Sequence, residues 1–263
     1  MFKKILITFI IILTAGCSTI NMNIFSQANK ETTSVLCIGM ENSKFGNCPG
    51  AQVDATRMHN LLKKYSNKTT LLISNKATKS VVVQKMKEVC QNDLAIIYYS
   101  GHGGDKKQTE ETKLNFEEPS GKDQFLCLYD GGMLDDEIWS IISNAKGRVV
   151  LIFDCCHSGT MFRSANPLTF EIQKQKSKIA DGAFGASSKE PNMLCISGCP
   201  DDSYSYGSEN GGLLTNAILD IVSDKRTYER VWELLHNNYE LNKVEKIQFT
   251  EIGKSFKDYL IFR

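Results

Sequence analysis

Short apolar segments alternate with longer segments of helical periodicity along most of this chain. Parallel strands need crossover helices between them, so this alternation predicts an α/β fold with a mostly parallel sheet and helices on both faces. The expected strands are residues 35–40, 70–74, 94–99, 125–129, 149–153 and 193–197, and the expected helices are residues 51–64, 79–90, 135–145 and 213–222, with a helical tail at 228–238.

The first residues follow a different pattern. Lys3 and Lys4 precede an apolar run at residues 5–13, and small residues then lead to Cys17, as in a secretory signal. The run is short for a membrane span. Residues 13–17 resemble a bacterial lipoprotein signal, in which Cys17 carries the lipid, with an ordinary cleaved signal or an uncleaved anchor as the alternatives. We therefore expect an exported, membrane-anchored lipoprotein, periplasmic or on the cell surface.

The chain divides into three parts on this interpretation. Residues 1–17 form the export signal, the polar residues 18–33 form a tether, and residues 34–263 form one folded domain. Inside the domain, residues 159–191 lack any usable period. Because long segments without periodicity are usually surface loops, we expect a mobile loop there.

Charge and cysteine usage exclude two classes of partner. The 31 basic and 30 acidic side chains leave a formal net charge of +1, which generates no overall field that attracts nucleic acid. A peptide or small-molecule partner is expected instead. The nine cysteines are scattered, and Cys195 and Cys199 have no second cysteine or histidine pair beside them, which argues against zinc.

Two expected strands end in residues that are common in catalysis. Residues 94–99 are followed by Ser-Gly-His-Gly-Gly, which contains His102, and residues 149–153 are followed by Asp-Cys-Cys-His-Ser-Gly, which contains Cys156. Ligands bind open parallel sheets beyond the carboxyl ends of the strands. The histidine and the cysteine are therefore expected to meet at that edge, although 54 positions (156 minus 102) separate them.

A cysteine beside a histidine can attack a carbonyl carbon. The thiolate is the nucleophile, and a free thiol with a pKa of about 8.5 is mostly protonated at neutral pH unless a positive group stabilises its anion. His102 can do this and later protonate a leaving amine, while the main-chain N–H groups of Gly103 and Cys156 can bind the oxyanion. A buried inert thiol and a turn histidine bonded to backbone are the alternatives.

The strings Tyr-Ser-Gly-His-Gly and Phe-Asp-Cys-Cys-His-Ser-Gly resemble the histidine and cysteine motifs of metacaspases and related bacterial caspase-like peptidases. The resemblance extends from about residue 35 to residue 222 and implies a caspase-like three-layer fold. It implies a cysteine endopeptidase that needs no cofactor for its chemistry. The family's nucleophile immediately precedes His-Ser-Gly, which selects Cys156 over Cys155, and His157 is expected to point away from the thiol.

The resemblance also implies cleavage after arginine or lysine. Asp54, Ser100 and Asp154 match positions of the family's pocket for the residue before the cut, and paired carboxylates favour a cation. Asp54 is alternatively explained as a helix N-terminal residue favoured by the helix dipole. Residues 197–202 and 211–215 resemble the family's pocket loop and final core helix, with an ordinary polar loop as the alternative.

Calcium binding is a further expectation from the resemblance. Asp123, Asp135 and Asp136 match calcium ligands of several metacaspases, and hard cations bind clustered carboxylates. A fourth expected ligand is replaced by Arg163. Alternatively, Asp135 and Asp136 cap the helix that begins there.

Two other functions fit parts of the sequence. An exported caspase-like domain could bind partners as a scaffold without turnover, but the complete cysteine and histidine pair argues against this. A thiol redox role for Cys155 and Cys156 lacks the Cys-x-x-Cys spacing, and adjacent cysteines form a strained ring. The expected partners are therefore peptides or proteins with basic residues.

Basic residues in the loop after Cys156 also offer sites for self-cleavage. The alternative is that they are solvated charges of a surface loop. These residues are Arg163, Lys174, Lys176 and Lys178.

Overall fold

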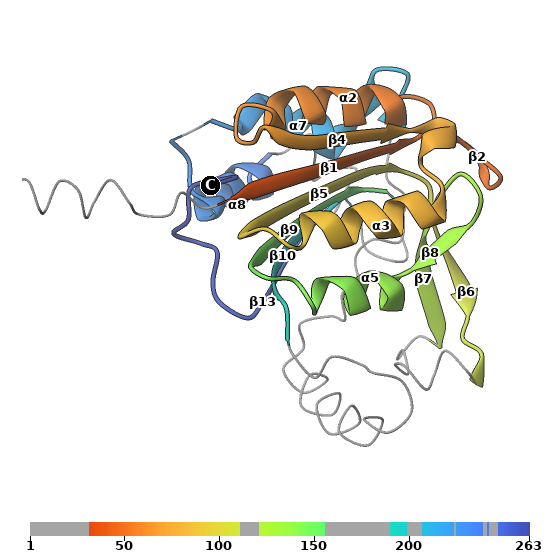
Figure 1. Cartoon of the computed structure of the whole chain (residues 1–263). Coiled ribbons are helices and arrows are strands. Elements are labelled where there is room, and N and C mark those ends of the chain that lie inside the picture. The colour runs from red at the N-terminus through yellow and green to blue at the C-terminus, as the bar shows by residue number, and fades with distance from the viewer. Residues whose placement is uncertain are drawn as a thin grey trace, which may run out of the picture. The chain divides into compact units, whose positions relative to one another are not determined.

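Six strands form a central sheet in the order β13-β10-β9-β5-β1-β4 (Figure 1). All neighbouring strands are parallel except β13, which runs antiparallel to β10. The strands are β1 (Thr33–Met40), β4 (Lys68–Ile73), β5 (Leu94–Gly101), β9 (Arg148–Asp154), β10 (Asn192–Ser197) and β13 (Gln248–Ile252). This computed structural model describes residues 32–110, 121–155, 190–198, 207–223, 225–238, 241 and 247–263.

Helices cover both faces of this sheet, as predicted. One face carries α2 (Ala51–Leu62), α7 (Leu213–Ile221) and α8 (Tyr228–His236), and the other carries α3 (Lys79–Val89) and α5 (Asp135–Ile142) (Figure 1). Strands that are buried on both faces must be apolar on both, which explains the continuous apolar runs in the sequence. None of the helices in the described ranges is long and apolar enough to cross a membrane.

Side chains along β5 alternate between the two faces. Ile96 and Tyr98 pack in the core beneath α2 and α7, whereas Ile97 and Tyr99 pack in the core beneath α3 and α5. Burial of one such side chain contributes about 1.5–3 kcal/mol. By the same alternation Ser100, the next residue, faces the α2 side. The strand therefore presents a polar group to α2 at its carboxyl end.

A second sheet is antiparallel and consists of β6 (Gly103–Lys107), β7 (Lys122–Cys127) and β8 (Gly132–Leu134). Residues 125–129 were expected to form a strand of the central sheet, and this prediction is wrong because residues 125–127 belong to β7. Only His102 separates β5 from β6, so the chain leaves the central sheet without a crossover helix.

The edge strand β13 was not expected from the sequence. All five of its residues are half-buried and they mix polar with apolar side chains. An edge strand is paired on one side only and is not enclosed by helices on both faces, so it lacks a clear apolar pattern.

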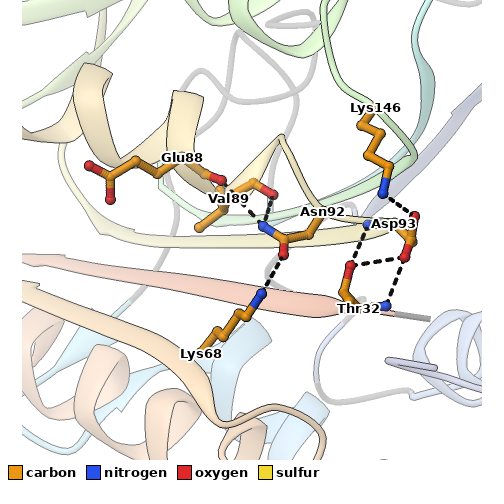
Figure 2. Close-up of polar contacts among 7 residues, drawn as sticks. All are labelled: Thr32, Lys68, Glu88, Val89, Asn92, Asp93 and Lys146. Atoms are coloured by element: carbon orange, nitrogen blue, oxygen red, sulfur yellow. Dashed lines mark hydrogen bonds and ion pairs between the residues drawn. The ribbon is translucent and has the colours of Figure 1, made fainter. Parts of the chain in front are cut away.

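Polar side chains join the amino ends of the strands (Figure 2). Thr32, just before β1, donates from its backbone N and from Oγ1 to Oδ2 of Asp93, both at 2.9 Å. The backbone hydrogen bond from Thr32 is the main reason why the pKa of Asp93 lies below its usual range, and Lys146, 2.9 Å from Oδ1, adds to the effect. Asn92 binds the last carbonyls of α3 and accepts from Lys68 at 3.2 Å. The start of β1 is thus fastened at the edge opposite the strands' carboxyl ends.

Candidate active site

The carboxyl ends of β5 and β9 lie side by side. The two strands are parallel neighbours, and the last pair in their register is Ser100 with Asp154. His102 comes two residues after Ser100, and Cys156 comes two residues after Asp154. Cys156 itself lies outside the described residues, which end at Cys155 in this part of the chain. The strand ends that lead to the predicted histidine and cysteine therefore share one edge of the sheet.

The imidazole of His102 is held by the segment that precedes α2. Its Nε2 lies 3.0 Å from the backbone oxygen of Asn47. A carbonyl oxygen only accepts hydrogen bonds, so Nε2 carries the proton in the neutral ring and Nδ1 is the nitrogen left for other chemistry. Asn47 ends β3 (Gly46–Asn47), which pairs with β2 (Asn42–Ser43) in a short hairpin. The hairpin thereby fixes the tautomer of the ring.

Tyr99 holds the backbone around His102. Its hydroxyl, shared between two acceptors, donates to the carbonyl oxygens of His102 at 2.7 Å and Cys127 at 2.8 Å. The ring is fully buried, and burial raises the pKa of Tyr99 well above its usual range. The N–H of Cys127 donates to the same oxygen of His102 at 3.0 Å. These bonds fix the residue between β5 and β6.

Gly103, the predicted oxyanion donor, is the first residue of β6 and pairs with Leu126. Bonded and non-bonded pairs alternate along an antiparallel ladder. The bond from Cys127 N to His102 O makes Gly103 part of a non-bonded pair. The N–H of Gly103 therefore points away from β7.

Cys155 lies in the core on the α3 side of the sheet, where it packs with Phe153 and Tyr99, and it is 1% exposed. Asp154, between Phe153 and Cys155, faces the opposite side, as strand alternation requires. The structure thus gives Cys155 the environment of an apolar core residue. Several predicted features lie outside the described residues: Cys17, residues 18–31 of the tether, His157, Cys199, and residues 159–189 with their basic side chains.

Asp54, Ser100 and Asp154, the three predicted pocket residues, are brought together by α2, β5 and β9. Asp54 and Asp154 are only 1% and 4% exposed. Oδ2 of Asp54 accepts from Ser100 Oγ at 3.1 Å and from the backbone N of Gly212 at 2.8 Å. Oδ2 of Asp154 accepts from the backbone N of Thr215 at 3.0 Å and from its Oγ1 at 2.6 Å. Two carboxylates therefore share one buried polar site.

Burial and mutual repulsion raise the pKa of Asp54 to about 7. Burial is the larger cause, the negative charge of Asp154 is the second, and hydrogen bonds from Gly212 and Ser100 together with the charge of Arg57 oppose the rise. Oδ1 of Asp54 is buried and accepts no hydrogen bond from the residues that the structure describes. An unpartnered carboxylate oxygen beside a second carboxylate favours a bound cation.

Two glycines press directly on the carboxylates. Gly211 and Gly212 form β12, which pairs with β11 (Gly207–Ser208) and precedes α7. A Cβ on Gly211 would overlap the carboxylate of Asp54, and a Cβ on Gly212 would overlap that of Asp154. Gly211 also has a φ of 100°, which a side chain would strain. Only glycine lets the backbone come this close.

The three predicted calcium ligands are not gathered into a metal site. Asp123 is buried, and its Oδ1 accepts from Gln108 at 2.7 Å. Asp135 and Asp136 stand in the first turn of α5, where the helix dipole favours acids, and Asp135 accepts from the backbone N of Asp136. Across the part of the chain that the structure describes, no group of three or more His, Cys, Asp or Glu side chains could hold a metal ion. Calcium binding by this chain stays a prediction.

Several site residues were not found by sequence reasoning. Asn47 contributes only a backbone oxygen, and a backbone group leaves no trace in residue type. Gly212 and Thr215 fall inside a segment that the resemblance selected, but contacts across 158 positions (212 minus 54) cannot be read from one sequence. The adjacent glycines before an apolar helix were the available signal of close backbone approach.

Comparison with known proteins agrees with this architecture. A family model described as the caspase domain, peptidase C14, matches residues 34–252. A solved structure from Geobacter sulfurreducens has a TM-score of 0.67 at 21% identity and covers 88% of this chain and 98% of its own. Caspase-1 from Spodoptera frugiperda has a TM-score of 0.53 at 10% identity, covering 86% of this chain and 90% of its own. At these identities the likeness shows the fold, which confirms the predicted caspase-like α/β architecture.

Curated relatives are metacaspases. Metacaspase-3 of Trypanosoma cruzi is 31% identical over 131 residues, which is 45% of this chain and 34% of that protein. Metacaspase-1 of Saccharomyces cerevisiae is 29% identical over 174 residues, or 63% and 34%. Inactive metacaspase-4 of Trypanosoma brucei brucei is 28% identical over 134 residues, or 45% and 35%. The chain spans about a third of these relatives' length. Because the family model covers most of the chain, the protein belongs to the caspase-domain family, peptidase C14.

Proposed function

We propose that this protein is a cysteine endopeptidase that cuts peptide bonds after arginine or lysine, with Cys156 as nucleophile and His102 as acid and base. The observation that carries the proposal is the buried carboxylate pair of Asp54 and Asp154 at the edge of the sheet where His102 stands. A peptidase of this specificity needs the carboxylate pair and the catalytic residues at the same edge, because the carboxylates would hold the substrate's basic side chain while the catalytic residues cut the next peptide bond.

The carboxylate pair supports the basic preference. Burying two anions is costly unless a cation joins them. Within the described ranges no group donates to Oδ1 of Asp54, and the hydroxyl of Ser100 donates to Oδ2. A guanidinium or ammonium group from the substrate would supply both the missing donor and the missing positive charge.

The orientation of His102 supports the chemistry. With Nε2 bonded to the carbonyl of Asn47, Nδ1 is available to take the proton from the thiol of Cys156. The thiolate attacks the carbonyl carbon, a C–S bond forms, and the carbonyl oxygen becomes an oxyanion. The N–H of Gly103 points away from β7 and is available to that oxyanion, together with the N–H of Cys156.

The second half of the reaction reverses the proton transfer. The imidazolium of His102 gives its Nδ1 proton to the leaving amine as the C–N bond breaks, and a thioester remains on Cys156. Water, deprotonated by His102, then attacks the thioester, releases the acid product and returns the thiol. Oxygen and hydrogen come from one water molecule, so the net reaction is hydrolysis and needs no further reactant.

A positional peptide-library assay tests the proposal. Wild type and Cys156→Ala are incubated with peptides varied at the position before the cut, each with and without calcium. The proposal predicts cleavage after arginine and lysine by wild type alone. Equal cleavage by both proteins, or cleavage without a basic preference, contradicts it. Activity that is unchanged by a chelator in a purified, active preparation contradicts calcium dependence, which stays a prediction.

A non-catalytic binding domain is the second candidate function, and the relative named inactive metacaspase-4 favours keeping it. This candidate predicts that wild type resists labelling by a peptide electrophile with a basic terminal residue.

We also propose that the protein is exported and anchored through a lipid on Cys17. The support for this proposal is the sequence pattern of the N-terminal residues. Mass spectrometry of the mature N-terminus tests this: an unlipidated Cys17 or an uncleaved signal contradicts it.

A further inference from the structure

Arg57 lies on α2 one turn after Asp54 and reaches across to the segment that precedes and starts α7. Its Nη1 donates to the side-chain Oδ1 of Asn216 at 2.6 Å and to the backbone oxygen of Asn210 at 3.3 Å. One nitrogen therefore bonds to two residues of the segment 210–216, one at each end.

The segment between those two contacts supplies hydrogen bonds to both pocket carboxylates. The N–H of Gly212 donates to Asp54, and the N–H and hydroxyl of Thr215 donate to Asp154. The backbone of Gly212 packs tightly against the carboxylate of Asp154, because a single added Cβ at Gly212 would overlap that side chain. A shift of even part of an ångström along 210–216 would change both sets of bonds.

We propose that Arg57 is a positioning residue of the basic-residue pocket, which holds residues 210–216 against Asp54 and Asp154 so that the two carboxylates are aligned for an arginine or lysine side chain. This inference rests on the proposed function. Arg57 need not touch the substrate, because it acts through Asn210 and Asn216. Its effect is therefore expected in substrate binding rather than in the chemical step.

The charge of Arg57 has a second, separable effect. Among the described residues, the titratable and charged groups that act on Asp54 are Asp154 on β9, Tyr98 on β5 and Arg57 on α2 itself. Arg57 is the cation of this set, and it opposes the rise in the pKa of Asp54. Removing the positive charge should move the pH at which Asp54 ionises upward, whereas lysine keeps the charge but lacks the Nη1 that bonds to Asn210 and Asn216.

Three variants separate these effects. Arg57→Gln removes the charge and the guanidinium, and Arg57→Lys keeps the charge. Arg230→Gln is the control, because Arg230 is an exposed arginine on α8 paired with Glu233 at 2.7 Å. KM and kcat for an arginine peptide are measured between pH 6 and pH 9. Hydrogen exchange of residues 210–216 is measured in the Cys156→Ala background, where self-cleavage cannot interfere.

Arg57→Gln is expected to raise KM by about tenfold with kcat within about twofold, to move the pH dependence of KM upward, and to speed exchange at Gly212 and Thr215. Arg57→Lys is expected to raise KM and exchange without the pH shift. If wild type cleaves basic peptides but Arg57→Gln matches Arg230→Gln in KM, the inference is overturned. If wild type cleaves none, the proposed function fails, and exchange decides the inference: unchanged exchange overturns it, and faster exchange supports the positioning of the segment.

Discussion

Ser100 of β5 and Asp154 of β9 are partners in the register of two adjacent parallel strands. Each stands two residues before a predicted catalytic residue, His102 and Cys156 respectively. Their side chains belong to the same buried site as Asp54. On the proposed function, strand pairing links the pocket residues to the catalytic residues, because any change in the β5–β9 register would move both.

Substrate affinity should depend on pH around neutrality. The pKa of Asp54 is raised to about 7, and a basic side chain binds best to the ionised form. KM for an arginine peptide should therefore be flat at alkaline pH and rise by up to about tenfold per unit below pH 7. Steady-state kinetics across pH 5.5–8.5 measure this. A KM that does not change across this range contradicts the assignment of Asp54 to the pocket.

Asp54→Asn should abolish activity on basic peptides and raise the stability of the folded domain. The folded-state pKa of about 7 lies above the unfolded value of 3.8, so the folded state holds an extra proton between these values and loses stability as pH rises through this window. At pH 8 the full penalty is present, and the neutral amide should stabilise the domain by about 1–4 kcal/mol while cleavage of basic peptides is lost.

Denaturant unfolding at pH 8 and pH 5 measures the effect of this substitution. The stabilisation should shrink towards pH 5, where Asp54 in the wild type is already protonated. A variant that is less stable than wild type at pH 8 contradicts the account of a repulsive buried pair.

The five parallel strands of the main sheet were predictable because buried parallel strands produce long apolar runs, but their order and the antiparallel β13 were not. The same logic predicted that His102 stands at the carboxyl edge of the sheet, whereas Ser100 and Asp154 were selected as pocket residues by the family resemblance. The prediction from apolar runs was wrong for residues 125–129, because a strand of the small antiparallel sheet contains an apolar run of the same kind. An apolar run does not show which strand it pairs with. Here β6 follows β5 after a single residue, and β7 pairs with β6 rather than with the central sheet.

Gly212→Ala should damage the pocket. An added Cβ would lie 2.7 Å from the carboxylate carbon of Asp154, and overpacking at such a site costs about 1–3 kcal/mol. Activity on basic peptides should fall at least about tenfold. Gly131→Ala is the matched control, because its Cβ would meet only the Lys44 ammonium at 3.8 Å. Equal activity and melting temperature in the two variants would contradict the close approach of β12.

Tyr99→Phe should lower kcat. The hydroxyl bonds the carbonyls of His102 and Cys127, and their loss should cost about 1–3 kcal/mol of stability and misplace the imidazole. Tyr129→Phe, at a side chain that is 45% exposed, should change neither. Thermal unfolding and kcat of both variants provide the comparison. Wild-type kcat in Tyr99→Phe means that the backbone of His102 is held by other contacts.

The contacts that complete the site could not be predicted because they are made by backbone atoms or join residues that are far apart in the sequence. The oxygen of Asn47 and the N–H of Gly212 carry no side-chain signature. The bridge from Arg57 to Asn216 joins two helix surfaces across 159 positions (216 minus 57), and a solvated arginine is the ordinary expectation from sequence. Motif and strand logic find the reactive groups, whereas the groups that position them emerge only from packing.

On the proposed function, His102 activates the thiol of Cys156 next to a pocket for basic side chains. Intact-mass analysis after treatment with an arginine-terminated peptide electrophile tests it most directly. We predict one adduct, located on Cys156 by peptide mapping, whose formation is at least about a hundredfold slower in His102→Ala. No adduct, an adduct on another cysteine, or an unchanged rate in His102→Ala would contradict activation of Cys156 by His102.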